Sequence, residues 1–114
     1  MKAGDLIAVS GNLYEYIGYE EEIHKVYDVE IDEKGILTVY GVKSFSDEEL
    51  SNRGIHLTEQ QWIGLTEYFI RQEYDLTEEE ISKTAEDIVC RCFPQSRIPL
   101  VEELPNYIAI YMNR

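Results

Sequence analysis

Two histidines and two cysteines are the side chains of this sequence best suited to bind a metal ion. His24, His56, Cys90 and Cys92 could supply the four ligands of a zinc site. Structural zinc sites normally use Cys-x2-Cys or His-x3-His spacing, because one local loop then sets the tetrahedron. The Cys-x-Cys pair falls in an expected helix, where side chains two residues apart point away from each other. We therefore predict no zinc site and no disulfide, with Cys92 buried, Cys90 partly buried and both histidines on the surface.

Carboxylates crowd the segment before Gly35, where Asp28, Glu30, Asp32 and Glu33 follow one another closely. A calcium loop places oxygen ligands at alternate positions and a glycine at the sixth, so that the chain bends around the ion. Here the glycine is eighth, counted from Asp28, and acids on an extended strand would stand in a row. The pattern indicates a solvated acidic face and not a calcium site.

No combination of residues predicts a catalytic centre. Asp28 and Glu30 would stand side by side on one strand, as paired carboxylates do in acid–base chemistry, but 23 acidic residues in a chain of 114 make such pairs common by chance. Asp32, Glu33 and Lys34 fall in a turn and lack the strand placement of a nuclease motif. There is no nucleophile elbow around a serine and no glycine-rich phosphate loop. We predict a protein that is not an enzyme and that uses no cofactor.

The net charge is the strongest functional signal. It is −13, from 23 Asp and Glu against 10 Lys and Arg, and the carboxylates are spread along the whole chain. Direct binding to nucleic acid requires a basic face, and adsorption to an anionic membrane requires the same, so both are disfavoured. The charge exceeds the magnitude of about 2 to 8 that solubility asks of a small domain. We therefore expect a basic protein partner.

The cysteine content and the apolar runs bear on the compartment. Two cysteines that do not pair are typical of a reducing cytoplasm. Gly4 and Asp5 interrupt the short apolar run at the start, so it does not match a signal peptide, and no apolar run reaches the ~20 residues of a membrane span. We expect a cytoplasmic protein.

Four segments in the N-terminal half have strand composition. They cover residues 5–10, 13–19, 23–31 and 36–42, and turn signals separate them. The last connection, Asp-Glu-Lys-Gly, is typical of a tight turn, because Asp hydrogen-bonds back to the backbone and Gly35 accepts a positive φ. We predict a four-stranded antiparallel meander that is curled or barrel-like. In its third strand Tyr27, Val29 and Ile31 should serve the core, while Asp28 and Glu30 project from the other face.

Helical patterns dominate the second half. Thr58 with Gln61, and Thr77 with Glu80, have the spacing of capping boxes and should open two helices. The first helix carries an apolar stripe of Trp62, Leu65 and Phe69, with Thr66 beside it; the second carries Ile81, Ala85, Ile88, Val89 and Cys92. The Phe-Pro pair at 93–94 should end the second helix. Residues 100–114 fit either a short helix restarted at Pro105 or a strand, and we expect the helix.

The expected fold class is therefore α+β, with two to three helices packed on the meander. Residues 1–114 should form a single domain, with a sheet half over 1–42 and a helical half over 58–114. The connecting segment 43–57 lacks apolar periodicity and is expected to be a loop, with room for one helical turn at 47–50.

Nine tyrosines accompany the acids, and several fall on expected strands. Some should fill the core, but an aromatic and acidic surface would also suit an Arg-rich partner, because rings stack on guanidinium groups and carboxylates pair with them. We expect Tyr14 and Tyr16 to contribute aromatic contacts. The acidic partner-binding face should comprise Glu20, Glu21, Glu22, Asp28, Glu30, Asp32 and Glu33.

Three functions remain open on these grounds. The leading one is a small inhibitor or regulator whose carboxylates stand where nucleic-acid phosphates would bind on a nuclease or nucleic-acid-binding protein; small acidic anti-CRISPR and anti-restriction proteins of phages and mobile elements have this general character. The second is an adaptor that binds through an apolar helix surface near Tyr68 or Tyr74. The third is a small enzyme with a pocket near His24 or His56. The sequence leaves the oligomeric state open.

Overall fold

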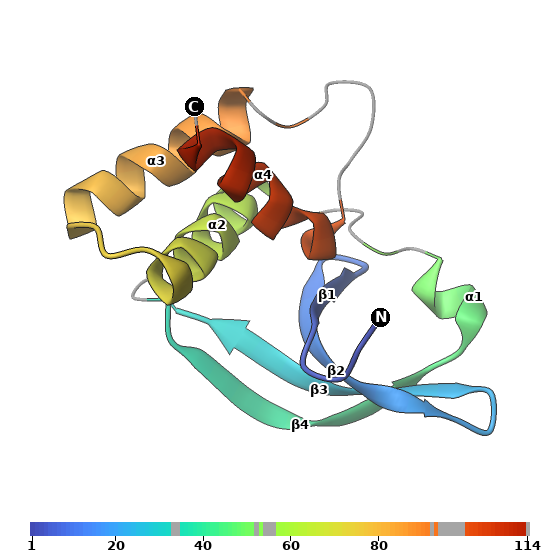
Figure 1. Ribbon diagram of the computed structural model, residues 1–114. Coiled ribbons are helices and arrows are strands. Elements are labelled where there is room, and N and C mark those ends of the chain that lie inside the picture. The colour runs from blue at the N-terminus through green and yellow to red at the C-terminus, as the bar shows by residue number, and fades with distance from the viewer. Residues whose placement is uncertain (33–34, 52, 54–56, 92, 94–99, 114) are drawn as a thin grey trace. The chain divides into compact units, whose positions relative to one another are not determined.

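The computed structural model shows an α+β protein in which a four-stranded sheet precedes the helices (Figure 1). It describes residues 1–113 except 33–34, 52, 54–56, 92 and 94–99. The chain divides into two compact units. We call Met1–Glu30, Leu37–Leu57 and Leu100–Glu102 the sheet unit, and Ile31–Ile36, Thr58–Pro99 and Glu103–Arg114 the helical unit. The expectation that the helices pack on the sheet stays a prediction.

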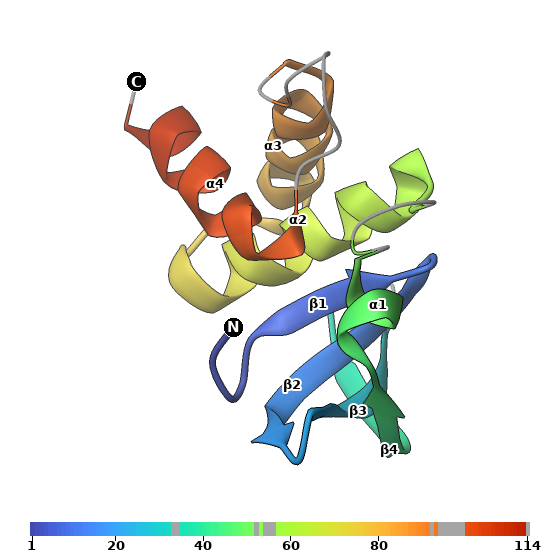
Figure 2. The same ribbon diagram turned by 90° about the vertical axis from the view of Figure 1, so that its right-hand side faces the viewer.

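The sheet is an antiparallel meander of β1 (Leu6–Val9), β2 (Asn12–Glu20), β3 (Ile23–Ile31) and β4 (Leu37–Phe45) (Figure 2). The strands hydrogen-bond in chain order, so β1 and β4 are the two outer strands. The meander is confirmed, but the expected barrel-like curling is wrong, because the sheet stays open. A four-strand meander has no further strand to join its edges, and closure needs a larger stagger and tilt.

The burial pattern of β3 differs from the expected alternation, and its neighbour β2 contains an irregularity. Tyr16 pairs with Val26, but the next partners are Gly18 and Lys25, so Ile17 is an extra residue in β2. Val26 is completely buried, whereas Tyr27 is exposed. The expectation that Tyr27 serves the core is therefore wrong, although Val29 is buried as expected.

The sheet unit has its own small core. Its buried side chains come from β1, β2, β3 and the short helix α1 (Asp47–Leu50), and Phe45 packs against them. They are Ile7, Val9, Tyr14, Tyr16, Val26 and Leu50. The helical turn at 47–50 is confirmed. After α1 the chain returns to β1, where Arg53 forms a single antiparallel bridge with Val9.

A later segment completes the sheet unit by an ion pair. Val101 is buried, and the carboxylate of Glu102 lies 2.5 Å from Nη2 of Arg53. Both side chains are largely buried, at 20% and 22% exposed. Glu102 follows Arg53 by 49 residues, so this contact ties a distant part of the chain to the segment beside β1.

We expect Glu102→Gln to lower the free energy of unfolding by about 1–2 kcal/mol, because a mostly buried guanidinium loses its charged partner. The matched control is Glu79→Gln. Glu79 pairs with Lys83 at the surface, where both side chains are more than three-quarters exposed, and its loss should change stability by about 0.5 kcal/mol or less. Urea denaturation monitored by circular dichroism would check this, and equal losses in the two variants would contradict it.

The helical unit contains α2 (Glu59–Glu73), α3 (Glu78–Arg91) and α4 (Leu104–Met112), which follows the 3-10 turn Val101–Glu103 (Figure 1). Both expected capping boxes are confirmed: Thr58 accepts from the Gln61 amide, and Thr77 accepts from the Glu80 amide. The C-terminal helix is confirmed too, with Pro105 in its first turn, where no backbone donor is needed.

The apolar stripes of α2 and α3 meet each other. The buried side chains are Trp62, Leu65, Thr66 and Ile70 on α2 and Ile81, Ala85 and Ile88 on α3. Phe69 and Val89 are only half-buried, and Cys92 lies outside the described residues.

The turn before β4 belongs to this unit: Gly35 has φ +74°, and a Cβ there would lie 3.1 Å from Cδ of Arg71. Asp32 accepts from the Ile36 amide, so the expected roles of Asp and Gly are confirmed.

Within the described residues, none of the helices combines the length and the apolar character that crossing a membrane requires.

Candidate protein-interaction surface

A two-residue turn places three glutamates at the end of the β2–β3 hairpin. Glu20 pairs with Ile23, so Glu21 and Glu22 form the whole turn, and both have positive φ, 52° and 65°. This is the geometry of a type I′ turn, which normally carries Asn and Gly. Glu20, Glu21 and Glu22 are all exposed. The sequence correctly predicted a solvated connection here, but the turn residues adopt an unfavourable backbone conformation for glutamate.

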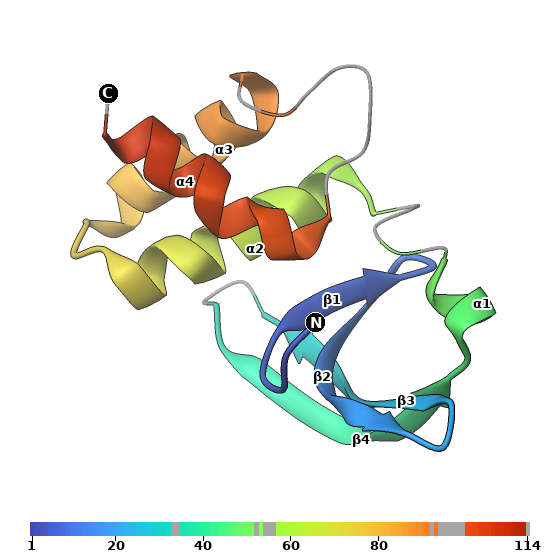
Figure 3. The same cartoon turned by 45° about the vertical axis from the view of Figure 1, so that its right-hand side comes forward.

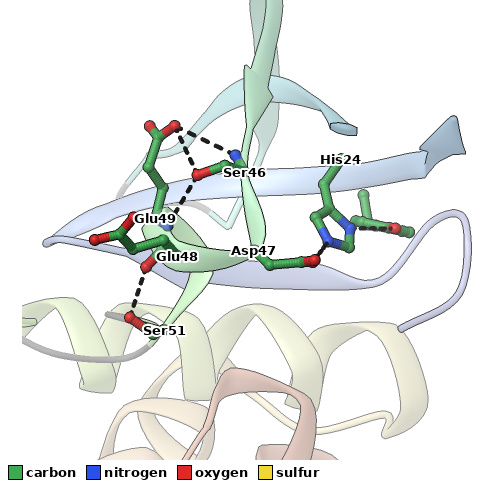
Figure 4. Close-up of polar contacts among 7 residues, drawn as sticks. His24, Ser46, Asp47, Glu48, Glu49 and Ser51 are labelled. Carbon is green, nitrogen blue, oxygen red and sulfur yellow. Dashed lines mark hydrogen bonds and ion pairs between the residues drawn. The ribbon is translucent and has the colours of Figure 1, made fainter. Parts of the chain in front are cut away.

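A second group of carboxylates lies on α1. Ser46 caps this helix: its hydroxyl accepts from the Glu49 amide at 3.2 Å, and the Glu49 carboxylate accepts from the Ser46 amide at 3.3 Å (Figure 4). Asp47, Glu48 and Glu49 form the first turn, and all are exposed. Sequence reasoning missed this group. The signal that would have found it is the capping-box spacing of Ser46 and Glu49.

His24 connects the two groups. Its Nε2 lies 2.5 Å from Oδ1 of Asp47 (Figure 4). Its Nδ1 lies 2.8 Å from the hydroxyl of Tyr16. Because a carboxylate only accepts, Nε2 donates to Asp47, and Nδ1 forms the second hydrogen bond with the Tyr16 hydroxyl. The His24 side chain is 12% exposed, so the expectation of a surface histidine is wrong.

The two groups consequently share one end of the sheet, as Figures 1 and 3 both show. We call Glu20, Glu21, Glu22, Asp47, Glu48 and Glu49 the acidic end. Its field acts on Tyr19, whose ring lies 4.5 Å from that of His24. The pKa of Tyr19 is raised, first by desolvation and then by the negative charges of Asp47 and Glu22. Lys25 offsets part of this negative charge, because its Nζ lies 3.4 Å from Oε2 of Glu20.

The other expected members of the acidic face are not part of the acidic end. Asp28 and Glu30 are near the far end of β3, so at about 3.3 Å per residue Glu30 lies roughly 26 Å along the strand from Glu22. Glu30 is exposed and accepts from the Tyr40 hydroxyl at 2.8 Å, while Asp28 is half-buried opposite Tyr14. Asp32 is exposed but belongs to the helical unit, and Glu33 lies outside the described residues.

The tyrosines expected to contact a partner are in the core. Tyr14 and Tyr16 are 4% and 6% exposed, so the expectation that they offer surface rings is wrong. Tyr14 packs edge-on against Phe45, and Tyr16 supports His24. Tyr14 and Tyr16 share one face of β2, and this is the face that packs in the core of the sheet unit. Tyr19 and Tyr40 are instead well exposed, at 54% and 64%.

The order Asp47, His24, Tyr16 has the logic of an activated nucleophile, in which a carboxylate orients a histidine and the histidine takes a proton. However, Tyr16, which has the nucleophile position, is buried in the core. The His24–Asp47 contact therefore serves to hold α1 against β3. Among the described residues no three His, Cys, Asp or Glu side chains gather to hold a metal ion. His56 and Cys92 lie outside those residues.

Comparison of the chain with family models, with curated proteins and with solved structures gives no match.

Proposed function

We propose that the protein is a non-enzymatic, cytoplasmic inhibitor or regulator that binds a basic protein through its acidic end. The carboxylates would occupy the positions of nucleic-acid phosphates on that partner. The observation that carries the proposal is the gathering of six exposed carboxylates from two separate segments, held together by the His24–Asp47 contact. Such a surface steers a basic partner and pairs with its arginines.

The distribution of charge supports this use of the sheet unit. By sequence it contains 11 Asp and Glu against 4 Lys and Arg, which gives −7, and the helical unit contains 12 against 6, which gives −6. Both units are acidic, but the carboxylates of the sheet unit are concentrated at a turn and at a helix start that share one end. This placement supports a binding surface over acidity that serves solubility alone.

A restriction or CRISPR nuclease is the class of partner that we propose to test first, by analogy of size and charge with acidic anti-defence proteins. The affinity of the protein for a purified candidate nuclease should fall by about a hundredfold between about 50 and 500 mM salt, because the Debye length shrinks severalfold. Duplex DNA should compete with the protein for the same partner. A complex that is insensitive to salt would contradict the proposal.

Charge reversal locates the surface. The variant Glu21→Lys, Glu22→Lys, Glu48→Lys should weaken binding by about a hundredfold or more. The variant Asp28→Lys, Glu30→Lys, Asp32→Lys should weaken it less, because Asp28 and Glu30 lie toward the end of β3 that is distant from the turn glutamates. The control reverses Glu73, Asp75 and Glu86, three exposed acids of the helical unit, and changes the net charge equally. Equal losses in the acidic-end variant and the control would show that only net charge matters.

An adaptor function is the second candidate. Tyr68 and Tyr74, near which an apolar helix surface was expected, are half-buried. Large exposed apolar side chains gather instead on β4, at Val39, Tyr40 and Val42.

A further inference from the structure

The strand β4 is exposed on both of its faces, which is unusual for a sheet strand. Val39, Tyr40 and Val42 are 49%, 64% and 62% exposed, and they include neighbours that point to opposite faces. Only the terminal residues Leu37 and Phe45 are half-buried. Because β4 is the outermost strand of the meander, its outer row of backbone donors and acceptors faces away from β3.

The usual protection of an edge strand is weak here. Proteins guard such edges with charged side chains, prolines or bulges. In a chain with 23 acidic residues, β4 has none, and its one charged residue is Lys43. The Nζ of Lys43 lies 5.9 Å from the centroid of the Tyr14 ring, so this charge is directed back over the sheet. An apolar, extended segment of another protein could therefore pair with β4.

The charges around β4 select the occupant. Glu30 accepts a hydrogen bond from the hydroxyl of Tyr40 on β4. This hydrogen bond and the charges of Glu30 and Asp28 raise the pKa of Tyr40. At the other end, Asp47, Glu48 and Glu49 follow β4 directly. An added strand would lie about 10 Å from β3, a separation comparable to the Debye length, so these acids attract a basic segment and repel an acidic one.

We propose that β4 binds an extended segment of the basic partner as a fifth strand, with apolar residues along the strand and Lys or Arg at its two ends. A second copy of this chain fits less well, because it would bring two sheet units of charge −7 together. The inference relies on the proposed function for the sign of the partner's charge, while the strand pairing stands on the exposure of β4.

The test uses three synthetic peptides and the full chain. RRTVTVTVRR has the proposed chemistry, EETVTVTVEE reverses its ends, and RRTVPVTVRR breaks its strand while it keeps its charge. The first should bind about tenfold more tightly than either of the others. It should also slow amide hydrogen exchange in β4 and leave the helical unit unchanged. Equal binding by RRTVTVTVRR and RRTVPVTVRR would overturn strand pairing and leave the charge-based proposed function standing.

Proline substitutions locate the edge on this protein. Neighbouring residues of a strand direct their amides to opposite sides, so one of Gly41→Pro and Val42→Pro removes an outward amide and the other an amide bonded to β3. A Cβ at Gly41 meets no atom within 4 Å. The variant that keeps the wild-type melting curve should bind RRTVTVTVRR about tenfold more weakly than its control, Gly41→Ala or Val42→Ala.

Further outcomes would overturn the proposal in whole or in part. Unchanged peptide affinity in a folded proline variant would show that β4 is not the binding edge. A concentration-dependent dimer of the protein alone, with slow exchange in β4, would assign the edge to a second copy. Should both proline variants unfold, hydrogen exchange in the wild-type chain decides, because unprotected β4 amides at saturating RRTVTVTVRR contradict strand pairing. Equal affinities of EETVTVTVEE and RRTVTVTVRR would show that the acids around β4 do not select a basic segment, and the proposed function would then fail as well. The proline variants would still test whether the peptide pairs with β4 as a strand.

Discussion

Replacing the two turn glutamates by Glu21→Asn and Glu22→Gly should raise the free energy of unfolding by about 1–2 kcal/mol. Both residues have positive φ, which costs a side chain such as glutamate about 1 kcal/mol or more at each position. Asn and Gly adopt this conformation readily and are the preferred residues of the type I′ turn. Part of the gain is offset, because glycine also increases the freedom of the unfolded chain.

The control for this variant removes the same charge without changing the turn. Glu20→Gln with Glu48→Gln takes two carboxylates from the acidic end, and neither residue has positive φ. Urea denaturation of both variants and of the wild type separates backbone strain from charge repulsion. An equal gain in the two variants would contradict the strain argument. Both should bind the basic partner more weakly, so the turn glutamates would trade stability for affinity.

Leu65→Ala should produce the largest single loss of stability, about 3 kcal/mol. Leu65 is 1% exposed in the stripe of α2 that packs on α3, and truncation leaves a cavity there. The neighbouring Thr66 is the control, because it is also completely buried and its hydroxyl donates to the Trp62 carbonyl at 2.8 Å. Thr66→Val keeps the shape and leaves no buried donor unpaired, so it should cost about 1 kcal/mol or less.

The fluorescence of Trp62, the one tryptophan of the chain, provides the measurement. Trp62 is 6% exposed and packs edge-on against Phe93, so its emission reports on the helical unit. The midpoint of urea denaturation should fall strongly for Leu65→Ala and slightly for Thr66→Val. A large loss in both would mean that the polar contact, and not the packing of the stripe, dominates this part of the core.

Local signals predicted much of the fold. The capping boxes at Thr58 and Thr77 and the Asp32–Gly35 turn depend on residues within four positions of one another, so spacing alone identifies them. The core-facing side of β3 was not accessible in the same way. Val26 and Val29 are both buried although alternation places them on opposite faces of the strand, so burial along β3 depends on packing that its own alternation does not encode.

The candidate surface was predicted only in part, and the reason is distance along the chain. Glu20, Glu21 and Glu22 adjoin one another, and their solvation is a local matter. Their association with α1 depends on the contact between His24 and Asp47, which are 23 residues apart. Nothing in the sequence around His24 distinguishes a largely buried histidine from a surface one. Tyr16, its second hydrogen-bond partner, is expected at the surface only because tyrosines accompany the acidic residues in this sequence.

The interleaving of the two units sets an order of events during synthesis. The sheet unit needs Val101 and Glu102, and the helical unit needs residues 31–36, so each unit contains pieces that lie within the sequence span of the other. The ribosome must therefore release the chain through residue 102 before the Arg53 ion pair can form. Folding of the sheet unit should finish late, after α2 and α3 have been made, although its four strands are the first to emerge.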